Sequence, residues 1–360
     1  MATCRFEAPD DAALDALYED IAHTDLQPLW ELSGLLTPTP KVKAVPHRWR
    51  GKELRELGER AGELVPVDRG GDRRVLSLSN PGLGGAPYAT STLWGAVQYL
   101  GPGETAPAHR HTPAALRFVL EGEGVWTLVD GDPLHMSAGD LVLTPSWTWH
   151  EHHNPGDTSM TWFDALDLPL VEALDAVFFE PGFEPGEGRT VPSATAGRSA
   201  SERRFGGGPG LLPGGSTAPA PAHSPLLRYQ WADTDRALTD QLAEAGSKAE
   251  RTGHAHVRFA DPTNGRDVMP TMRCEMHRYL PGHAASAERR TGSALVAVFR
   301  GAGAVELDGV PHALAPGDLI AIPSWTSVRV LADESMDLFS VSDAPVLEAL
   351  SLFRAETDAG

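Results

Sequence analysis

The sequence has little cysteine, few basic residues and no long apolar run, and each shortage argues against a class of protein. Only Cys4 and Cys274 occur among 360 residues, with no CxxC pair, so we expect neither a disulfide framework nor a sulfur-ligated metal site. Any metal must depend on nitrogen and oxygen ligands. The 30 basic against 49 acidic residues give a net charge of −19, which argues against nucleic acid or an anionic lipid surface as a partner.

Targeting signals are also lacking. Residues 1–23 are acidic and amphipathic, without the basic start and apolar core of a signal peptide, and no later run is long and apolar enough to span a bilayer. We therefore expect a cytoplasmic protein with no membrane partner, whose partners are small molecules or proteins.

Short β-rich runs dominate the chain from about Leu93 onward. LWGAVQYL, RFVLEGEGVWTLV and DLVLTP alternate with the turn sequences GPGE, VDGD and SAGD, which is typical of antiparallel sandwiches and barrels. Before them, residues 11–36 and 53–64 carry helical apolar spacing, as surface or interface helices do. The sequence predicts an all-β fold with flanking helices.

The second half of the chain repeats the first. VDGDPLHMSAGDLVLTPSWT from Val129 is matched by LDGVPHALAPGDLIAIPSWT from Leu307, and LGPGE from Leu100 by YLPGH from Tyr279. A match of this length indicates an internal duplication, and therefore two copies of one small β-barrel.

The repeats suggest four regions along the chain. Residues 1–90 form a helical and strand extension that packs on the barrels, and residues 91–180 form the first barrel. Residues 181–225 are rich in Pro, Gly, Ala and Ser and should be a long, largely irregular linker. Residues 226–360 form the second barrel.

Three histidines of the first repeat form a metal-binding pattern. His109 and His111 in PAHRHT are two residues apart, so on a strand both imidazoles leave the same face. His150, on the strand after the SAGD turn, is placed to supply a third ligand. An HxH pair by itself is equally well explained as chance on a solvated strand.

The residues around these histidines follow the spacing of the two cupin motifs. The first motif fits Gly103, His109 and His111, and the second fits Gly139, Pro145, His150 and Asn154. The acid that usually follows the HxH pair is missing, because Ala115, Leu116 and Arg117 occupy that stretch. Neutral imidazole suits Fe, Cu, Ni and Zn, so ligand type alone does not choose the metal. Three neutral ligands leave the full 2+ charge on the site and favour a chelating anionic substrate.

Longer stretches of both halves match one enzyme family. They are LWELSGLLTPTP, PAHRHT, ALRFVLEGEG, GDLVLTPSWTWHEH and WFDALDLPLV in the first half, and VMPTMRCEMHRYLPG and FSVSDAPVLEAL in the second. In these stretches the chain resembles the gentisate 1,2-dioxygenase family, which includes salicylate and 1-hydroxy-2-naphthoate dioxygenases. The resemblance covers nearly the whole chain outside the linker.

This resemblance implies a fold and a reaction. The fold is a bicupin, two double-stranded β-helix (jelly-roll) barrels, with one Fe(II) per chain on His109, His111 and His150. The substrate is a small aromatic hydroxy acid whose carboxylate and ortho hydroxyl chelate Fe(II), O2 is the co-substrate, and the ring opens between the carbons bearing those groups. Gentisate (2,5-dihydroxybenzoate) would give maleylpyruvate. The resemblance and the apolar faces of the N-terminal helices also imply a homo-oligomer, most simply a tetramer.

Arg117, His152 and Asp164 are the candidate catalytic residues. Arg117 faces the barrel interior if Val119 and Glu121 share its face, and there it could clamp a carboxylate or stabilise reduced oxygen; the alternative is a salt bridge at the rim. His152 shares the face of His150 and could relay a proton or bind a second ring hydroxyl. It could equally be a supporting or surface histidine.

Asp164 and the candidate substrate-binding residues complete the predicted site. The Asp164 carboxylate could orient His152 or a ligand imidazole, or be a structural acid at a strand end. Trp162 shares its face. From the resemblance, Arg73, Trp94 and Gln98 line the aromatic pocket together with Arg117, although a Trp on a β-run is more often a core residue.

Other functions remain open at this point. Pro113 and Ala114 replace polar residues found near the metal in many family members, which puts the substrate in doubt: salicylate, a substituted salicylate and 1-hydroxy-2-naphthoate are alternatives. A non-catalytic metal-binding or ligand-binding cupin, or a metal isomerase with Mn or Zn, is a further alternative. The isomerase would be active without oxygen.

The second barrel should be metal-free and structural. Aligning the repeats places Glu288 opposite His109, Arg290 opposite His111 and Val328 opposite His150. Arginine offers no lone pair and valine cannot coordinate, so the ligand set is lost.

Overall fold

The computed structural model describes residues 11–65, 74–182, 197–208, 211–214, 221–283 and 286–357. The chain divides into two compact units, Met1–Lys41 and Val42–Gly360. In the first unit, helix α1 (Asp11–His23) is followed by the 3-10 turn η1 (Leu29–Glu31), and the Tyr18 hydroxyl joins them by donating to Glu31 Oε1 at 2.9 Å. Among the described helices, none has the length and apolar character to cross a membrane.

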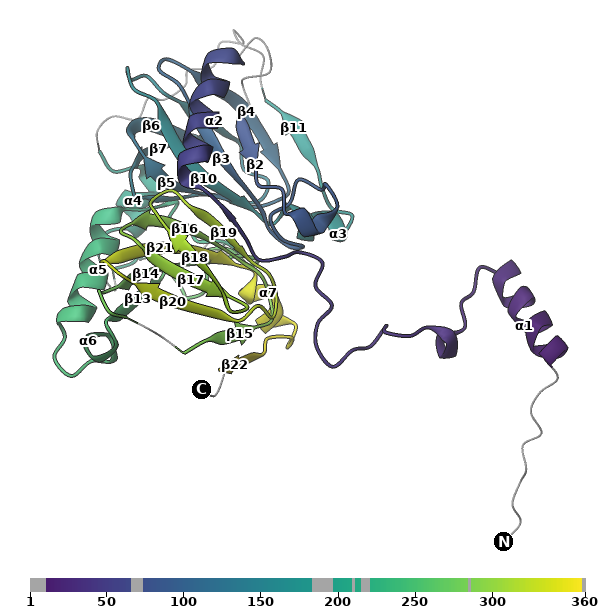
Figure 1. The fold of residues 1–360 in the computed structure, drawn as a ribbon. Coiled ribbons are helices and arrows are strands. Elements are labelled where there is room, and N and C mark those ends of the chain that lie inside the picture. The colour runs from purple at the N-terminus through teal and green to yellow at the C-terminus, as the bar shows by residue number, and fades with distance from the viewer. Residues whose placement is uncertain are drawn as a thin grey trace. The chain divides into compact units, whose positions relative to one another are not determined.

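The second unit holds both barrels, and the first barrel is made of two facing sheets (Figure 1). Its six-stranded sheet has the order β12 (Arg228–Tyr229), β8 (Leu141–Thr144), β5 (Ala115–Glu121), β10 (Met160–Leu166), β3 (Trp94–Leu100), β2 (Val75–Ser77). Its five-stranded sheet has the order β11 (Phe179–Pro181), β4 (Thr105–His111), β9 (His150–His153), β6 (Glu123–Val129), β7 (Asp132–Ser137). Val119 and Trp162 of one sheet pack with Val125 and Leu134 of the other, so the apolar core lies between them.

The second barrel repeats this plan. Its six-stranded sheet has the order β1 (His47–Trp49), β19 (Leu319–Ile322), β16 (Ala294–Arg300), β21 (Met336–Ser342), β14 (Arg273–Tyr279), β13 (His254–Arg258). Its five-stranded sheet has the order β18 (Val310–Leu314), β17 (Gly303–Leu307), β20 (Val328–Ala332), β15 (Glu288–Arg290), β22 (Ala355–Thr357). The expected all-β fold with two barrels and flanking helices is confirmed.

Each barrel borrows one edge strand from the other half of the chain. Strand β1, which precedes the first barrel in sequence, pairs with β19 of the second, and β12, which precedes the second barrel, pairs with β8 of the first. A matching ion pair accompanies each exchange: Arg48 with Asp318, and Arg228 with Asp140. The two halves are therefore joined by reciprocal strand exchange.

The two six-stranded sheets pack face to face through an apolar core. Phe118 of the first barrel stacks on Phe339 of the second, with ring centroids 4.2 Å apart and planes 6° apart, and Phe299 meets Phe118 edge-on at 5.4 Å. All three side chains are buried. Aromatic burial of this kind stabilises an interface by area and by ring geometry together. The interface behaves as a shared core of one structural unit.

The turns that the repeats share have the same backbone conformation. Trp147 and Trp325 of the two PSWT sequences have φ of 62° and 66°, a left-handed conformation that is unfavourable for a residue with a side chain. In both copies the backbone N–H of the tryptophan donates to a backbone carbonyl. Trp147 donates to His111 at 2.8 Å, and Trp325 donates to Arg290 at 2.7 Å. The repeated sequence is thus kept because it specifies this turn.

The helices lie outside the barrels. They are α2 (Gly51–Leu64), α3 (Leu168–Ala173), α4 (Ala200–Phe205), α5 (Trp231–Ala243), α6 (Lys248–Thr252) and α7 (Ala344–Ala349), with the 3-10 turn η4 (Pro81–Leu83). Helix α4 falls inside the segment predicted to be a largely irregular linker, and it is a short element that the sequence did not lead us to expect. Ser199 and Glu202 form a capping box there, and the Glu202 carboxylate is buried against Arg228 and Gln230.

Candidate metal centre and its surroundings

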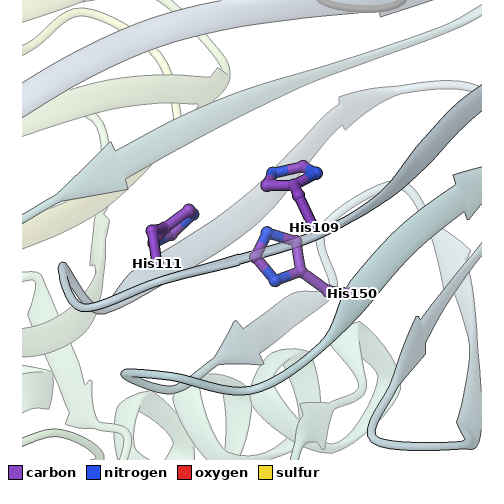
Figure 2. A group of neighbouring side chains, drawn as sticks. All are labelled: His109, His111 and His150. Atoms are coloured by element: carbon purple, nitrogen blue, oxygen red, sulfur yellow. The ribbon is translucent and has the colours of Figure 1, made fainter. Parts of the chain in front are cut away.

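The structure brings His109, His111 and His150 together on the neighbouring strands β4 and β9 of the first barrel (Figure 2). His109 and His111 leave the same face of β4, and His150 lies directly opposite His109 in the antiparallel β4–β9 pair. The ring centroids are 5.6 Å apart for His109 and His111, 4.3 Å for His109 and His150, and 4.9 Å for His111 and His150. One ligand atom from each side chain lies within 4.8 Å of the others. This is the convergence expected of three facial ligands.

The hydrogen bonds of the three rings settle their tautomers. Each Nδ1 lies against the backbone carbonyl of a residue two positions away: Pro107 O at 3.0 Å for His109, Pro113 O at 2.7 Å for His111 and Thr148 O at 3.0 Å for His150. A carbonyl only accepts, so each Nδ1 donates, and in the neutral ring Nε2 is then the nitrogen that keeps the lone pair. Such an arrangement orients an imidazole for a metal ion.

Burial keeps His150 neutral. Burial, and after it the nearby Arg117 cation, hold the pKa of His150 well below its ordinary value. Its Nε2 is buried without a hydrogen-bond partner, which is unfavourable for a polar atom unless a ligand completes it. Within the described part of the chain, no other group of three potential ligands converges in this way. The donor set therefore fits a divalent transition metal.

Arg110, between the two ligands on β4, points to the opposite face and anchors the strand. Its guanidinium lies 4.4 Å from the centre of the Trp147 ring and 4.7 Å from that of Trp149, and its Nε donates to Glu180 at 2.7 Å. Strand β11, which carries Glu180, pairs with β4 alongside the ligands. The stacked cation and the added strand restrain the segment that holds two of the three histidines.

Arg117 and Asp164 form a buried ion pair next to the three histidines. They are direct partners across the β5–β10 pair, with Nε and Oδ1 3.3 Å apart, and both are almost fully buried. Arg117 Nη1 also donates to Thr144 Oγ1 at 2.8 Å, and Trp162 Nε1 donates to Asp164 Oδ2 at 3.1 Å. The Nε and Oδ1 atoms are close but not aligned as a hydrogen bond, so each keeps capacity for another partner.

The electrostatics of this pair are set by burial. Burial lowers the pKa of Arg117, and the Asp164 carboxylate opposes that change. Burial raises the pKa of Asp164 to about 6, against the opposing effects of Arg117 and of the Trp162 hydrogen bond. Burial thus shifts both pKa values toward the neutral forms of the two side chains. Arg117 lies inside the barrel, so the alternative of a salt bridge at the rim is excluded.

Of the two residues expected to share the inward face of Arg117, only Val119 does so. Val119 shares its inward face and packs with Trp162. Glu121 does not, because the register shifts between Thr161 and Trp162 and turns Glu121 outward to an ion pair with Arg55. A one-residue irregularity of this kind reverses the face of the residues beyond it.

His152 is buried, and its partner is not the one that the sequence suggested. Asp164 is committed to Arg117 and Trp162, whereas His152 Nδ1 lies 2.8 Å from Thr127 Oγ1 on the neighbouring strand β6. Burial, and then the Arg117 cation, hold the pKa of His152 well below its ordinary value. A surface histidine is therefore excluded, and the proposed orientation of His152 by Asp164 is not found.

The remaining predicted residues divide into those placed near the site and one outside the described residues. Gln98 is buried and lies opposite Trp162 across the β3–β10 pair. Trp94 begins β3 on the same face and is half-buried. Arg73 lies outside the described residues. Thr127 and Thr144 were not singled out from the sequence, because a lone threonine carries no motif and its partner depends on strand register.

The second barrel keeps the strand register of the first, but other residues stand at the positions of the three histidines and of the Arg117–Asp164 pair. Glu288 pairs with Val328 as His109 pairs with His150, which supports the alignment made from the sequence. Val296 pairs with Ser340 as Arg117 pairs with Asp164. The backbone frame of the site is thus present twice and its chemistry once.

Comparison with known proteins gives a consistent result. The cupin domain family matches residues 96–166. A gentisate 1,2-dioxygenase of a Streptomyces species is 49% identical over 352 residues, covering 97% of this chain and 96% of that protein. The crystal structure of salicylate 1,2-dioxygenase from Pseudaminobacter salicylatoxidans is 46% identical, with a TM-score of 0.90 over 99% of this chain and 100% of that one. A structure of that enzyme with gentisate adducts is 45% identical, with a TM-score of 0.89 over 100% of this chain and 97% of that one.

Proposed function

Because the chain belongs to the gentisate 1,2-dioxygenase family of bicupin enzymes, we propose that it holds one Fe(II) and opens gentisate to maleylpyruvate. The chain is an oxidoreductase that incorporates both atoms of O2 into its substrate. The observation that carries the proposal is the convergence of three imidazoles beside a buried arginine, in a chain 49% identical to a gentisate 1,2-dioxygenase.

His109, His111 and His150 would hold the metal. Their nitrogen donors suit Fe(II) among other divalent ions, and an all-histidine set leaves the ion's charge for anionic ligands. When bound, Fe(II) supplies open positions for a chelating hydroxy acid and the redox activity that O2 chemistry needs. The Nδ1 hydrogen bonds to backbone carbonyls hold the three rings in place for it.

Arg117 would orient the substrate. Its guanidinium is buried, always cationic and planar, so it presents paired donors to a carboxylate or to oxygen that gains charge. Asp164 and Thr144 hold it from two sides. Trp162 and Gln98 contribute an apolar wall and an amide to the same interior face, and we assign them, with Trp94 and Arg73, to the aromatic ring of the substrate.

His152 would receive the second ring hydroxyl of gentisate, the group that salicylate lacks. His152 lies on the same strand as His150, and the centroids of the two rings are 6.2 Å apart. The Trp162 ring is a second aromatic neighbour, with its centroid 5.4 Å from that of His152. Replacing His152 by Ala should spare metal binding and slow turnover of gentisate by about 10²-fold if it transfers a proton in the slow step. An unchanged rate would confine it to a supporting role.

Salicylate is the second candidate substrate, because the salicylate enzyme is 46% identical to this chain. The test is oxygen uptake by anaerobically Fe(II)-loaded protein given gentisate, salicylate, substituted salicylates or 1-hydroxy-2-naphthoate. We expect the largest kcat/KM for gentisate and no uptake without iron. A larger value for salicylate would overturn the substrate, and turnover of any of them with Zn in the absence of oxygen would overturn the reaction class.

We also propose a cytoplasmic homotetramer. The first unit carries exposed apolar side chains, among them Leu26, Trp30 and Leu36 at 62%, 68% and 93% exposure. Such a set is unusual on a surface that stays in water and is typical of an interface. Sedimentation equilibrium is the test, and a monomer at micromolar concentration would refute the assembly.

A further inference from the structure

We propose that Thr127 is a positioning residue for the reaction: it fixes His152 in the Nδ1–H tautomer, so that Nε2 meets the substrate as a hydrogen-bond acceptor. This inference rests on the proposed function for the identity of the substrate. The assignment of the tautomer rests only on the contacts of three side chains, Thr127, Met136 and His152.

The three side chains form a short chain of hydrogen bonds in the interior of the first barrel. Thr127 and His152 are direct partners across the β6–β9 pair, and Thr127 Oγ1 lies 2.8 Å from His152 Nδ1 and 3.0 Å from Met136 Sδ. Thr127 and Met136 have no exposed surface, and His152 has 1%. Water therefore does not replace either contact.

The direction of the chain depends on where the single hydroxyl hydrogen of Thr127 goes, and the hydroxyl is placed to donate to Met136 Sδ. A thioether sulfur can only accept a hydrogen bond, and a threonine hydroxyl has a single hydrogen to give. When that hydrogen points to Met136 Sδ, Thr127 Oγ1 has only lone pairs left for His152, so Nδ1 must carry the hydrogen between them. Nε2 then bears the lone pair. The β-branched side chain of Thr127 has few rotamers, which keeps its oxygen in this position.

His152 differs in this respect from the three metal-binding candidates. Their Nδ1 atoms face backbone carbonyls, which accept whatever the side chains around them are. The tautomer of His152 depends on a hydroxyl, which can donate or accept, and thus on the sulfur behind it. With the described residues the His152 ring makes no other hydrogen bond, so Nε2 is the ring nitrogen left for a substrate.

The second barrel supplies an internal comparison. The repeat alignment and the β17–β20 register place Val305 at the position of Thr127, Leu314 at that of Met136 and Val330 at that of His152. Val305 and Leu314 belong to the apolar core of that barrel, with Val330 packed against it. The hydroxyl, the sulfur and the imidazole are present together in one copy and absent together in the other. This is expected if the three side chains function together.

The consequence for the substrate is a preference in hydrogen-bond direction. An Nε2 lone pair accepts from an O–H group, so it recognises an aromatic acid that carries a second, protonated ring hydroxyl. An Nε2–H could only donate to the hydroxyl oxygen and could not accept the hydroxyl hydrogen. Losing one such hydrogen bond to a neutral partner typically costs about tenfold in affinity or rate.

The experiment uses full-length protein with 15N-labelled histidine rings, in the wild type and in the variants Thr127→Val, Thr127→Ser and Met136→Leu. Val and Leu occupy these positions in the second barrel, so the fold tolerates both shapes. The His152 signals are identified by their loss in His152→Gln, and the spectra are recorded on metal-free protein. In the wild type and in Thr127→Ser we expect protonated Nδ1 and unprotonated Nε2. In Thr127→Val and Met136→Leu we expect this preference to weaken or reverse.

Kinetics of the Fe(II)-loaded enzyme supply the second readout. We expect kcat/KM for gentisate to fall about tenfold in Thr127→Val and to be restored in Thr127→Ser, with iron content equal in both. An Nε2–H tautomer in the wild type, or spectra unchanged in both Thr127→Val and Met136→Leu, would overturn the inference. A wild-type enzyme that prefers salicylate to gentisate would instead overturn the proposed substrate and leave the tautomer result standing.

Discussion

The two barrels place different chemistry on one backbone frame. Where the first barrel buries the Arg117–Asp164 ion pair, the second has Val296 opposite Ser340. Removing a carboxylate and a guanidinium from water costs several kcal/mol per ion, and apolar replacements of similar shape are often as stable. The second barrel shows that the fold does not require the buried pair. Its presence in the first barrel is therefore a matter of function.

The turns give the opposite result. Asp130 and Asp308 have φ of 45° and 50°, and the tryptophans of the two PSWT turns also share a left-handed conformation. These unfavourable backbone conformations are present in both barrels, although only the first barrel has the three histidines. What the copies share thus specifies the fold, and what they do not share specifies the reaction. Four changes test this division.

The largest effect is expected at the metal ligands. Replacing His109, His111 or His150 singly by Ala should remove nearly all iron and activity and leave the barrel folded, because two imidazoles hold Fe(II) much more weakly than three. The measurement is iron per chain after anaerobic loading, with circular dichroism as the check on folding. Glu288→Ala, at the position that matches His109, is the control and should change neither. Iron retained in a histidine variant would remove that residue from the ligand set.

Arg117→Lys should come next, with kcat lower by about 10²-fold, because a single ammonium cannot reproduce a planar pair of donors aimed at charge that develops in the reaction. Iron content should stay the same. Val296→Ala, at the matching position of the second barrel, is the control and should affect stability without changing kcat. A rate for Arg117→Lys within about twofold of the wild type would assign Arg117 to structure.

A smaller effect is expected from pH. The pKa of Asp164 is raised to about 6, so the carboxylate is charged above that pH and protonated below it. Turnover should fall as the pH drops through about 6, since the protonated form no longer pairs with Arg117. Asp164→Asn should be slower and should lose this acid limb. Iron content must be measured at each pH, because protonation of the ligands would also lower the rate. An acid limb that persists in Asp164→Asn at constant iron content would exclude Asp164 as its source.

The smallest effect on activity is expected at the two strand exchanges, where stability should change instead. Both aspartates accept from a backbone N–H, Asp140 from Trp231 at 2.9 Å and Asp318 from Gly51 at 2.8 Å. The two sites differ in the ion pair, which measures 2.8 Å between Arg228 and Asp140 and 3.5 Å between Arg48 and Asp318. Asp140→Ala should therefore lower the free energy of unfolding by about 3 kcal/mol and Asp318→Ala by about 1 to 2 kcal/mol. Urea unfolding of the two variants measures this difference. Equal losses, or a larger loss in Asp318→Ala, would contradict the ranking.

The parts of the fold and site that could be predicted are those coded locally. His109 and His111 face the same way because strands alternate with a period of two residues, and the repeated turns fix where each strand begins. The pairing of Arg117 with Asp164 could not be predicted in this way. The two residues are far apart in sequence, and their contact depends on the register of two strands.

Short elements were missed for a different reason. Strands β1 and β12 are only three and two residues long, too short to show alternation, and each pairs with a distant half of the chain. Helix α4 was missed although Ser199 and Glu202 stand at the spacing of a capping box. The Pro and Gly content of the surrounding segment led us to predict an irregular linker, and the capping-box spacing was given too little weight.

The reciprocal exchange of β1 and β12 has a consequence for the history of the chain. A fragment that ended before Arg228 would leave β8 with an open edge and would expose Phe118 and Phe163, so neither half is a self-sufficient protein. The second barrel carries Glu288, Arg290 and Val328 where the first carries its three histidines. The gene was not free to lose the copy. The second barrel is therefore an obligatory scaffold for the first, and truncations that seek a minimal catalyst should yield insoluble protein.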